Sequence, residues 1–551
     1  MVYDVAIIGA GPCGLAVAAR LREATPSALF TDDEHIRYWR RFNRRETIEN
    51  ERRFQRRAAD SDLGDRSHSG RSIIVLDAQS DEWMSAWKEK FRKLRINYLR
   101  SPLFFHPDPR DRDSLLAFSH LHSRTSELQE IPNVVGKEMS KHRVKKRRQR
   151  RITQHLRIDD RDRIDYFTPS AALFEDFCDD IVDRYDLRSV VVRARVENVE
   201  YGDLGGLTSA EGFTLATDQG AIFSRIVVLA VGPGCKPFIP IDSNLQLGAE
   251  PGSVCHCFAT ADEHCLPEHV LRKIENGLPT SVVVVGGGLT SAQIADLLIC
   301  RGVTKVWLLI RGSYKLKHFD VDLEWVSKVR NHQMSVFWSA DSDEERLEML
   351  KRARNGGSIT PKFDRILQRH VLSGHLAIVT HTRVQDGIWC GRSQTWSIRL
   401  SSGQEDAPLC VDHIIHATGA APNIEKVQCM KQMLEKYPLP SCNGLPRLTD
   451  DLMWHNSVPL FLTGGLAALR LGPGAANLAG ARQGAERIAW KIEDLLGKGQ
   501  MALPEEEDSV LADGRGSQLR ERERNTMAEQ RSEYTGGFVN QFEALTLNEG
   551  N

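Results

Sequence analysis

The chain has 551 residues and a formal net charge of -1 at pH 7, with 41% hydrophobic and 27% charged residues. A chain of this length needs more than one hydrophobic core, so two or more domains are expected. The near-zero charge argues against nucleic acid or another partner bound mainly by charge, and no apolar stretch is long enough to cross a bilayer.

The cysteines and the first residues bear on the cellular compartment. There are 11 cysteines, an odd number, and none of them form a CxxC pair. This usage favours reduced thiols over a disulfide framework. An apolar strand is expected from Val2, directly after Met1, which leaves no room for a cleavable signal peptide. We therefore expect a cytoplasmic protein.

Near its start the chain is predicted to form a strand, a glycine turn, a helix and a second strand. In the turn, Gly9, Gly11 and Gly14 have the GxGxxG spacing, which brings a dinucleotide pyrophosphate to the free N–H groups at a helix N-terminus. The second strand, ALFT, is expected to end at Asp32 and Asp33. They lie about 20 residues after the glycines, where an acid that binds a ribose hydroxyl is expected. A dinucleotide site is predicted here, the alternative being a purely structural glycine turn.

Two basic stretches are expected to be surface insertions. Residues 35–72 are polar and rich in arginine, and residues 141–151 read KHRVKKRRQRR. The second stretch also fits a nuclear localisation signal or a nucleic-acid patch, but it lacks interleaved aromatic residues, which favours a solvated loop. Between the two, YLRSPLFF at 98–105 is expected either to pack in the core or to line a ligand site, with Arg100 as the residue to test.

A second strand–turn–helix unit begins with SVVVVGGGLTSA. Gly286 and Gly288 keep the first two positions of the glycine pattern, and Ser291 replaces the third, where a small side chain still allows the helix to pack on the strand. Two such units predict two dinucleotides in one protein. One would be a bound redox carrier, and the other would deliver hydride to it. The simplest arrangement is FAD at the first loop and NADPH at the second.

The end of the next strand, VWLLI, bears on the choice of nicotinamide cofactor. This strand runs into Arg311, where the first unit has acids. A guanidinium at that position suits a 2'-phosphate, which favours NADPH over NADH. The alternative is an arginine on a solvated strand end. Lys315 and Lys317 are expected either to assist Arg311 or to face water.

The expected fold class is α/β, with two Rossmann-like dinucleotide-binding domains, the second inserted in the first. Residues 1–275 and 401–495 are assigned to the FAD-binding domain, and residues 280–400 to the NADPH-binding domain. Residues 497–551 are polar, so a disordered tail is expected there.

These motifs resemble those of the two-dinucleotide-binding-domain flavoproteins and, within them, the class B type of flavin-dependent monooxygenases. GAGPCG is similar to their FAD loop, and GGGLTSA is similar to their NADPH loop. VVLAVGPGCKPFIP at 227–240 resembles the strand that leaves the FAD domain. HATG at 416–419 resembles the strand that returns to it with the ATG motif, which implies that Thr418 and Gly419 bind cofactor. The subgroup with the most similar motifs is the ornithine/lysine N-hydroxylases, and LRSPLFFHPDP indicates a more distant similarity to the oxidative-stress-induced growth inhibitor proteins.

The resemblance implies an NADPH- and FAD-dependent monooxygenase. In that family NADPH reduces FAD, oxygen adds to the reduced flavin, and the flavin hydroperoxide oxygenates a small nucleophile, such as the amine of L-ornithine. The implied partners are a small-molecule substrate and molecular oxygen, whereas the motifs indicate neither a catalytic side chain nor an oligomeric state. Two alternatives stay open: an NADPH oxidase or quinone reductase without oxygen transfer, and a non-enzymatic FAD-binding regulator.

Three other expectations follow from motifs that do not match. CHCFATADEHC at 255–265 holds metal-ligand residue types, but its spacing does not fit common zinc patterns, so no metal is predicted. Disulfide reductases share the two-domain plan but need a CxxC or CxxxxC pair, which this chain lacks, and Cys13 is expected to pack between strand and helix. The fingerprint FxGxxxHxxxW/Y of Baeyer–Villiger and microsomal-type flavin monooxygenases is absent, so the substrate is not implied.

Overall fold

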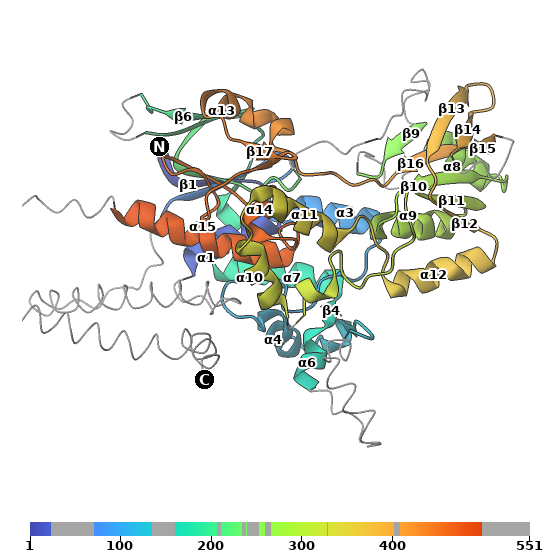
Figure 1. Cartoon of the computed structure of the whole chain (residues 1–551), viewed down its shortest axis with the longest axis horizontal. Helices are drawn as coiled ribbons and strands as arrows, with labels where there is room; N and C mark the ends of the chain where they lie inside the picture. The colour runs from blue at the N-terminus through green and yellow to red at the C-terminus, as the bar shows by residue number, and fades with distance from the viewer. Residues whose placement is uncertain are drawn as a thin grey trace, which may run out of the picture. The chain divides into compact units, whose positions relative to one another are not determined.

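The computed structural model (Figure 1) describes residues 1–23, 71–134, 160–205, 211–233, 239, 253–258, 266–327, 329–401 and 408–498. The chain divides into two compact units, residues 1–494 and 495–551. The two basic insertions and the tail predicted from the sequence lie outside the described residues, except for residues 71, 72, 497 and 498. Within the described ranges, no helix is both long and apolar enough to span a bilayer.

The first sheet has eight strands among the described residues and is built around β1 (Val2–Ile8). β1 pairs in parallel with β2 (Ile73–Asp77) and with β8 (Gly220–Leu229), and β8 pairs in parallel with β20 (Val458–Leu462). The remaining strands are β5 (Val191–Arg193), β6 (Val196–Gly202), β7 (Gly212–Thr217) and β19 (Met453–His455). The second half of β1 and the end of β8 are apolar and fully buried, as expected for parallel strands covered on both faces.

Helices α1 (Pro12–Arg22) and α15 (Leu478–Lys498) lie side by side in this part of the molecule (Figure 1). Arg20 of α1 donates to the carboxylate of Glu486 on α15 at 2.6 Å, and both side chains are buried. Breaking a buried pair of this kind leaves an uncompensated charge, so the contact fixes how the last helix meets the first. The other helices of this part are α3 (Ser85–Lys93), α4 (Ser114–Leu121), α6 (Asp160–Asp165), α7 (Ala171–Arg184), α13 (Lys431–Lys436) and α14 (Ala468–Leu471). Two small antiparallel sheets have two strands each: β3 (Leu128–Glu130) pairs with β4 (Phe167–Pro169), and β17 (Ser441–Cys442) pairs with β18 (Leu445–Pro446).

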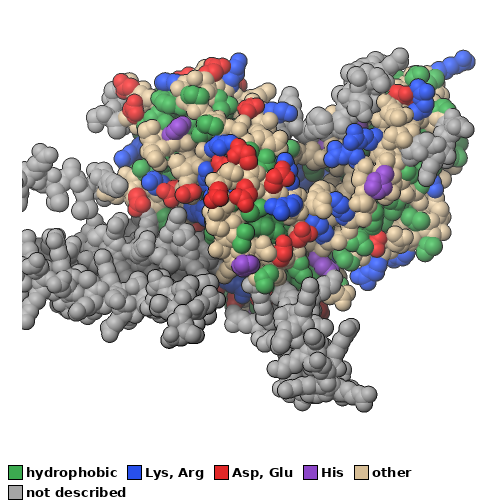
Figure 2. All heavy atoms as spheres, in the orientation of Figure 1, with side chains coloured by type: hydrophobic (Ala, Val, Ile, Leu, Met, Phe, Trp, Pro, Cys, Tyr) green, Lys and Arg blue, Asp and Glu red, His purple; other side chains and the backbone are tan. Residues whose placement is uncertain are grey.

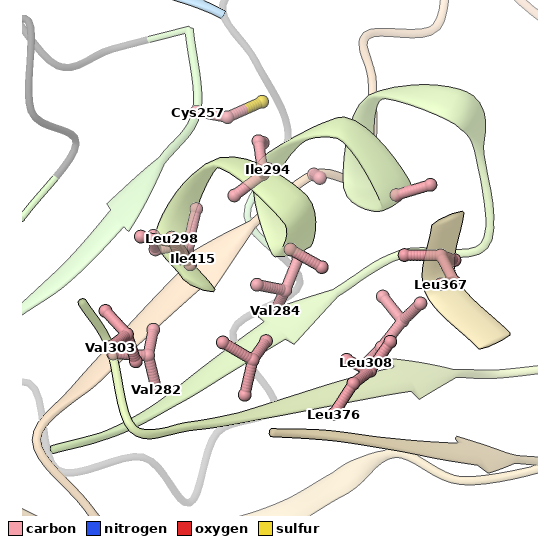
Figure 3. Packing of buried hydrophobic residues seen from close by; sticks show 14 of the residues in the cluster. Cys257, Val282, Val284, Ile294, Leu298, Val303, Leu308, Leu367, Leu376 and Ile415 are labelled. Atoms are coloured by element: carbon pink, nitrogen blue, oxygen red, sulfur yellow. The ribbon is translucent and has the colours of Figure 1, made fainter. Parts of the chain in front are cut away.

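The second sheet is parallel and has the order β12-β11-β10-β16-β9 among the described residues. Its strands are β9 (Val254–His256), β10 (Ser281–Val285), β11 (Lys305–Ile310), β12 (Leu376–Thr380) and β16 (His413–His416). One face is covered by α8 (Glu268–Glu275), α9 (Leu289–Cys300) and α12 (Pro361–Leu372). Figure 3 shows Ile294 and Leu298 of α9 over Val282 and Val284 of β10. The other face packs on an antiparallel sheet of β13 (Val384–Cys390), β14 (Thr395–Leu400) and β15 (Leu409–Val411).

The predicted α/β class with parallel sheets is confirmed, but two strands lie elsewhere than the sequence indicated. β1 lies between β2 and β8, and ALFT, which the sequence predicts as the second strand of the first unit, lies outside the described residues. β16, with the histidine of HATG, pairs with β10 and belongs to the second sheet. β9, expected in the same domain as β1, also belongs to the second sheet. The sheet therefore draws strands from both sides of the expected 280–400 insertion.

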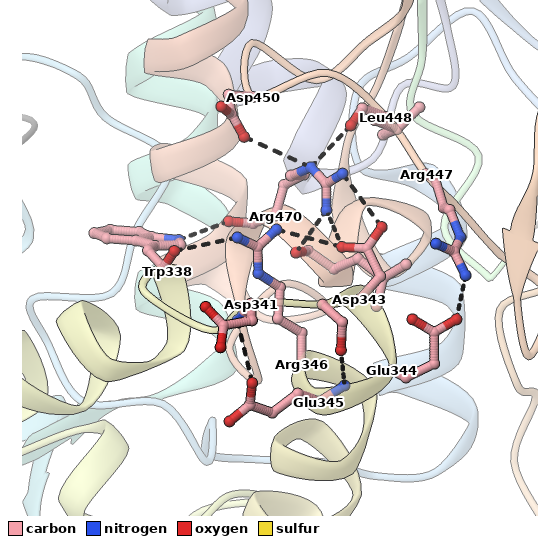
Figure 4. Close-up of polar contacts among 12 residues, drawn as sticks. Trp338, Asp341, Asp343, Glu344, Glu345, Arg346, Arg447, Leu448, Asp450 and Arg470 are labelled. Carbon is pink, nitrogen blue, oxygen red and sulfur yellow. Dashed lines mark hydrogen bonds and ion pairs between the residues drawn. The ribbon is translucent and has the colours of Figure 1, made fainter.

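The helices between β11 and α12 pack against the C-terminal segment of the chain. α10 (Arg330–Trp338) and α11 (Asp343–Arg354) share a hydrophobic core with that segment. The buried residues of this core are Phe337, Leu350, Cys442, Leu445 and Leu469. Figure 4 shows the polar contacts beside this core, where Arg470 donates to the carboxylate of Asp343 at 2.5 Å. The indole N–H of Trp338 donates to the Arg470 carbonyl at 2.9 Å. Around α11, which is acidic in its first turn and basic in its last, the face in Figure 2 carries both signs of charge.

Candidate functional site

The first glycine loop connects β1 to α1. Gly9 has a φ of +110°, and a Cβ there would lie 2.6 Å from the carbonyl oxygen of Ala230, so only glycine fits. A Cβ on Gly14 would lie 2.1 Å from the Gly9 oxygen, which explains why the helix can pack so close to the strand. Gly11 differs from both: its φ is -82°, and nothing lies within 4 Å of a Cβ built on it. The loop thus leaves open space in front of Gly11 and the N-terminus of α1.

Among the described residues, an acid that reaches this loop is Asp77, the last residue of β2. One carboxylate oxygen of Asp77 accepts the N–H of Ala10 at 2.9 Å, and the other accepts the N–H of Gln79 at 2.9 Å. Asp32 and Asp33, the acids predicted from the sequence, lie outside the described residues. Counting residues from the glycines missed Asp77. The signal available was the apolar run IIVLD, which has a strand composition and ends in an acid.

The C-terminal segment meets the first loop at the end of β20. A Cβ on Gly464, whose φ is +70°, would lie 3.3 Å from the sulfur of Cys13. Burial raises the pKa of the Cys13 thiol to about 11, so the thiol stays protonated at neutral pH. Cys13 therefore packs between elements, as the sequence predicts, and is not a reactive thiolate.

The second glycine loop connects β10 to α9 and meets the strand end of β16. A Cβ on Gly286 would lie 2.5 Å from the oxygen of Ala417, and the Ala417 N–H donates to Val285 at 2.8 Å. Ser291 is fully buried, and its hydroxyl donates to the Gly288 oxygen at 2.7 Å. Thr418 and Gly419 come directly after Ala417, so the structure brings the predicted HATG residues to the second loop instead of the first sheet.

Arg311 lies on the surface directly after β11, the strand that pairs with β10 next to the second glycine loop. It is exposed, and within the described part of the chain it makes no hydrogen bond or ion pair. The two lysines named with it are engaged: Lys315 donates to the carbonyl and side-chain oxygens of Asn355 at 2.6 and 2.8 Å, and Lys317 pairs with Asp322 at 2.8 Å. Arg311 is therefore the cation of this group that can bind a phosphate without losing an internal contact.

Two buried histidines lie at the carboxyl edge of the second sheet. His256 and His416 are cross-strand neighbours at the ends of β9 and β16, and each is at most 2% exposed. Neither ring nitrogen of His416 has a hydrogen-bond partner, and burial lowers the pKa of His416 to about 4, so the ring is neutral. Across the described ranges, no group of three His, Cys, Asp or Glu side chains is arranged to hold a metal ion. The sequence pattern did not single out His416.

The aromatic residues around Arg100 have two kinds of surroundings: some pack in the core, and others line a small cavity. The indole N–H of Trp83 donates to the Leu187 carbonyl at 2.8 Å, which is a core contact. Phe104 and Phe105 line a cavity of about 40 Å³ together with Arg330 and Arg482, among other residues. A cavity of that size has room for an ordered water molecule.

The described fold matches solved structures of flavoprotein hydroxylases. An ornithine N-hydroxylase from Kutzneria sp. 744, named with reduced FAD, NADP+ and L-ornithine, has a TM-score of 0.59 and 16% identity, covering 90% of this chain and 100% of that one. The FAD-bound cadaverine monooxygenase of desferrioxamine biosynthesis from Erwinia amylovora has a TM-score of 0.54 and 14% identity, covering 93% and 99%. L-Lysine 6-monooxygenase from Pseudomonas syringae has a TM-score of 0.52 and 15% identity, covering 89% and 99%. At these identities the likeness is one of fold.

Sequence comparison adds nothing to this likeness: no protein-family model matches the chain, and no curated protein matches it.

Proposed function

We propose that this protein is an NADPH- and FAD-dependent monooxygenase of small nucleophilic substrates. The observation that carries the proposal is the pair of glycine loops, each following the central strand of a parallel arrangement and leading into a helix N-terminus. Ligands of open α/β sheets bind at this edge of the sheet. One loop would hold a flavin and the other a hydride donor, which is the pair of cofactors that such an enzyme uses.

FAD is assigned to the first loop. The space in front of Gly11 and the free N–H groups of α1 suit its pyrophosphate, since a helix N-terminus attracts anions. Gly9 and Gly14 hold the turn that creates this space. Asp77, at the end of the strand beside β1, is also placed to bind the ribose, while Asp32 and Asp33, to which the sequence assigned that contact, lie outside the described residues. When bound, FAD supplies the redox and oxygen chemistry.

NADPH is assigned to the second loop. The N-terminus of α9 suits its pyrophosphate, and the exposed guanidinium of Arg311 suits the 2'-phosphate. Thr418 and Gly419 border the same loop and would contact the cofactor from β16. A 2'-phosphate therefore distinguishes the expected cofactor from NADH.

The substrate is proposed to be a small molecule with a nucleophilic nitrogen. The support is the fold alone: the three solved proteins compared above are named as an ornithine N-hydroxylase, a cadaverine monooxygenase and an L-lysine 6-monooxygenase. Ornithine, cadaverine and lysine are all primary amines. This chain's own residues would bind and orient such a molecule and keep water away from the flavin. Primary amines are accordingly the first substrates to test.

A coupled assay tests the proposal. The FAD-loaded protein is mixed with NADPH, oxygen and, in turn, ornithine, lysine and cadaverine, and NADPH, peroxide and hydroxylated product are each measured. Product formed in step with NADPH consumed is the expected result. NADPH consumed with an equal amount of peroxide and no product would indicate an oxidase or reductase. Tight FAD without NADPH oxidation would leave a non-enzymatic regulator.

A further inference from the structure

Arg100 belongs to the part of the chain that forms the first sheet, but its guanidinium contacts the segment between β11 and α12. Arg100 itself is held in the first part, where the neighbouring Leu99 donates its N–H to the Pro169 carbonyl at 3.1 Å. Its side-chain acceptors are the carbonyls of Lys317, His318 and Phe319 at 3.0, 3.0 and 2.6 Å, and the Ser358 hydroxyl and carbonyl at 2.9 and 3.4 Å. All of these acceptors are neutral. The planar fork of five donors matches such a set, which a lysine cannot satisfy fully.

This arrangement of a charge among neutral oxygens has an energetic cost. Burial lowers the pKa of Arg100 to about 10, with Asp320 opposing that shift and Arg354 adding to it. The group still carries its charge at neutral pH. A side chain that only filled space would not need to carry a charge here. The contact therefore indicates that the position of the segment held by Arg100 matters.

That segment includes a turn, Asn355–Ser358, which lies directly on the second glycine loop. A Cβ built on Gly357 would lie 2.7 Å from the N of Gly288 and 2.8 Å from the carbonyl carbon of Gly287. The turn is fastened at both ends, by Lys315 on Asn355 and by Arg100 on Ser358. One of the contacts that hold the turn therefore comes from the part of the chain that forms the first sheet.

We infer that Arg100 is a positioning residue for NADPH: it holds the turn Asn355–Ser358 at the distance from the second glycine loop that lets the loop receive the pyrophosphate. The inference rests on the proposed function of that loop. The hydrogen bonds that Arg100 makes with described residues go to residues 317–319 and to Ser358, so it acts on the loop through the Ser358 end of the turn. Loss of Arg100 should weaken NADP+ binding while the FAD site stays intact.

Arg100→Ala and Arg100→Lys test this, with Arg124→Ala as the matched control. Arg124 is an arginine of the same part of the chain that pairs with Glu127 and Asp176 and does not contact the turn. FAD content, melting temperature and the Kd for NADP+ are measured by absorbance, thermal unfolding and calorimetry. The expected result is a Kd raised about tenfold or more in Arg100→Ala, as for the loss of hydrogen bonds to a charged group, with partial recovery in Arg100→Lys and no change in Arg124→Ala.

Hydrogen exchange on the wild-type protein gives a second test that does not depend on a variant folding. The peptide that covers Asn355–Ser358 should exchange more slowly when NADP+ is added. Unchanged exchange, or an unchanged Kd in a folded, FAD-loaded Arg100→Ala protein, would overturn the inference. Failure of the wild-type protein to bind NADP+ would instead overturn the proposed function, so the two failures are distinct.

Discussion

Gly11→Ala should weaken FAD binding without destabilising the fold. Gly11 has a φ of -82°, which alanine adopts without strain, and no atom lies within 4 Å of the new Cβ. Replacing glycine by alanine at a compatible position stabilises the native state by about 0.4–1 kcal/mol through the unfolded chain. The same methyl group, however, would occupy the space that lets the backbone approach the pyrophosphate. We expect FAD affinity to fall about tenfold or more, equivalent to about 1.4 kcal/mol, while the apoprotein is as stable as the wild type or slightly more.

Gly9→Ala is the control within the same loop. Its Cβ would meet a backbone oxygen at 2.6 Å, and its φ of +110° is unfavourable for alanine, so the free energy of unfolding should fall by at least about 1–2 kcal/mol. Urea unfolding of the apoproteins and FAD titration by flavin fluorescence measure both effects. The reasoning would be refuted by a Gly11→Ala protein that binds FAD as the wild type does, or by one that is destabilised as much as Gly9→Ala.

Three further predictions concern the acid, the phosphate-binding cation and a buried histidine. Asp77→Asn should lower FAD affinity about tenfold, since it loses the charge that accepts the Ala10 N–H and that is proposed to accept the ribose hydroxyls. Wild-type affinity in an FAD titration would show that the ribose is bound by another residue. Arg311→Ala should raise KM for NADPH about tenfold and leave KM for NADH nearly unchanged, whereas equal losses for both cofactors would show that no 2'-phosphate is bound there. The free energy of unfolding should fall between pH 6.5 and about pH 4, because the unfolded chain protonates His416 at 6.5 and the folded chain only at about 4. His416 should contribute a slope of about 1.4 kcal/mol per pH unit in that window, and a His416→Gln protein followed by urea unfolding should show a correspondingly smaller slope.

The local parts of the site could be predicted from the sequence because they are encoded within a few residues. The turn geometry of Gly9 and Gly286 follows from a strand that must reverse into a helix without a Cβ in the way. The exposed Arg311 follows from its position directly after a strand. The α/β class follows from repeating apolar strands and helices, and the parallel sheets confirm it.

The long-range parts could not be predicted in the same way. The acid at the first loop was sought at a fixed distance, but the strand beside β1 begins only at Ile73, so Asp77 was missed. The sheet that β16 joins depends on which strand edge is free in three dimensions, a property that no short motif encodes. The contact of Gly357 with Gly288 joins two loops far apart in the chain, and glycine pairs such as this one also occur in ordinary turns.

The central claim is that a flavin at the first loop takes electrons from NADPH at the second. Anaerobic mixing of the FAD-loaded protein with NADPH, followed through the flavin absorbance, tests it most directly. The account predicts that the absorbance of oxidised flavin is lost on mixing with NADPH, that NADH is a much weaker reductant, and that the absorbance returns when oxygen is admitted. Flavin that stays oxidised in excess NADPH would contradict the account.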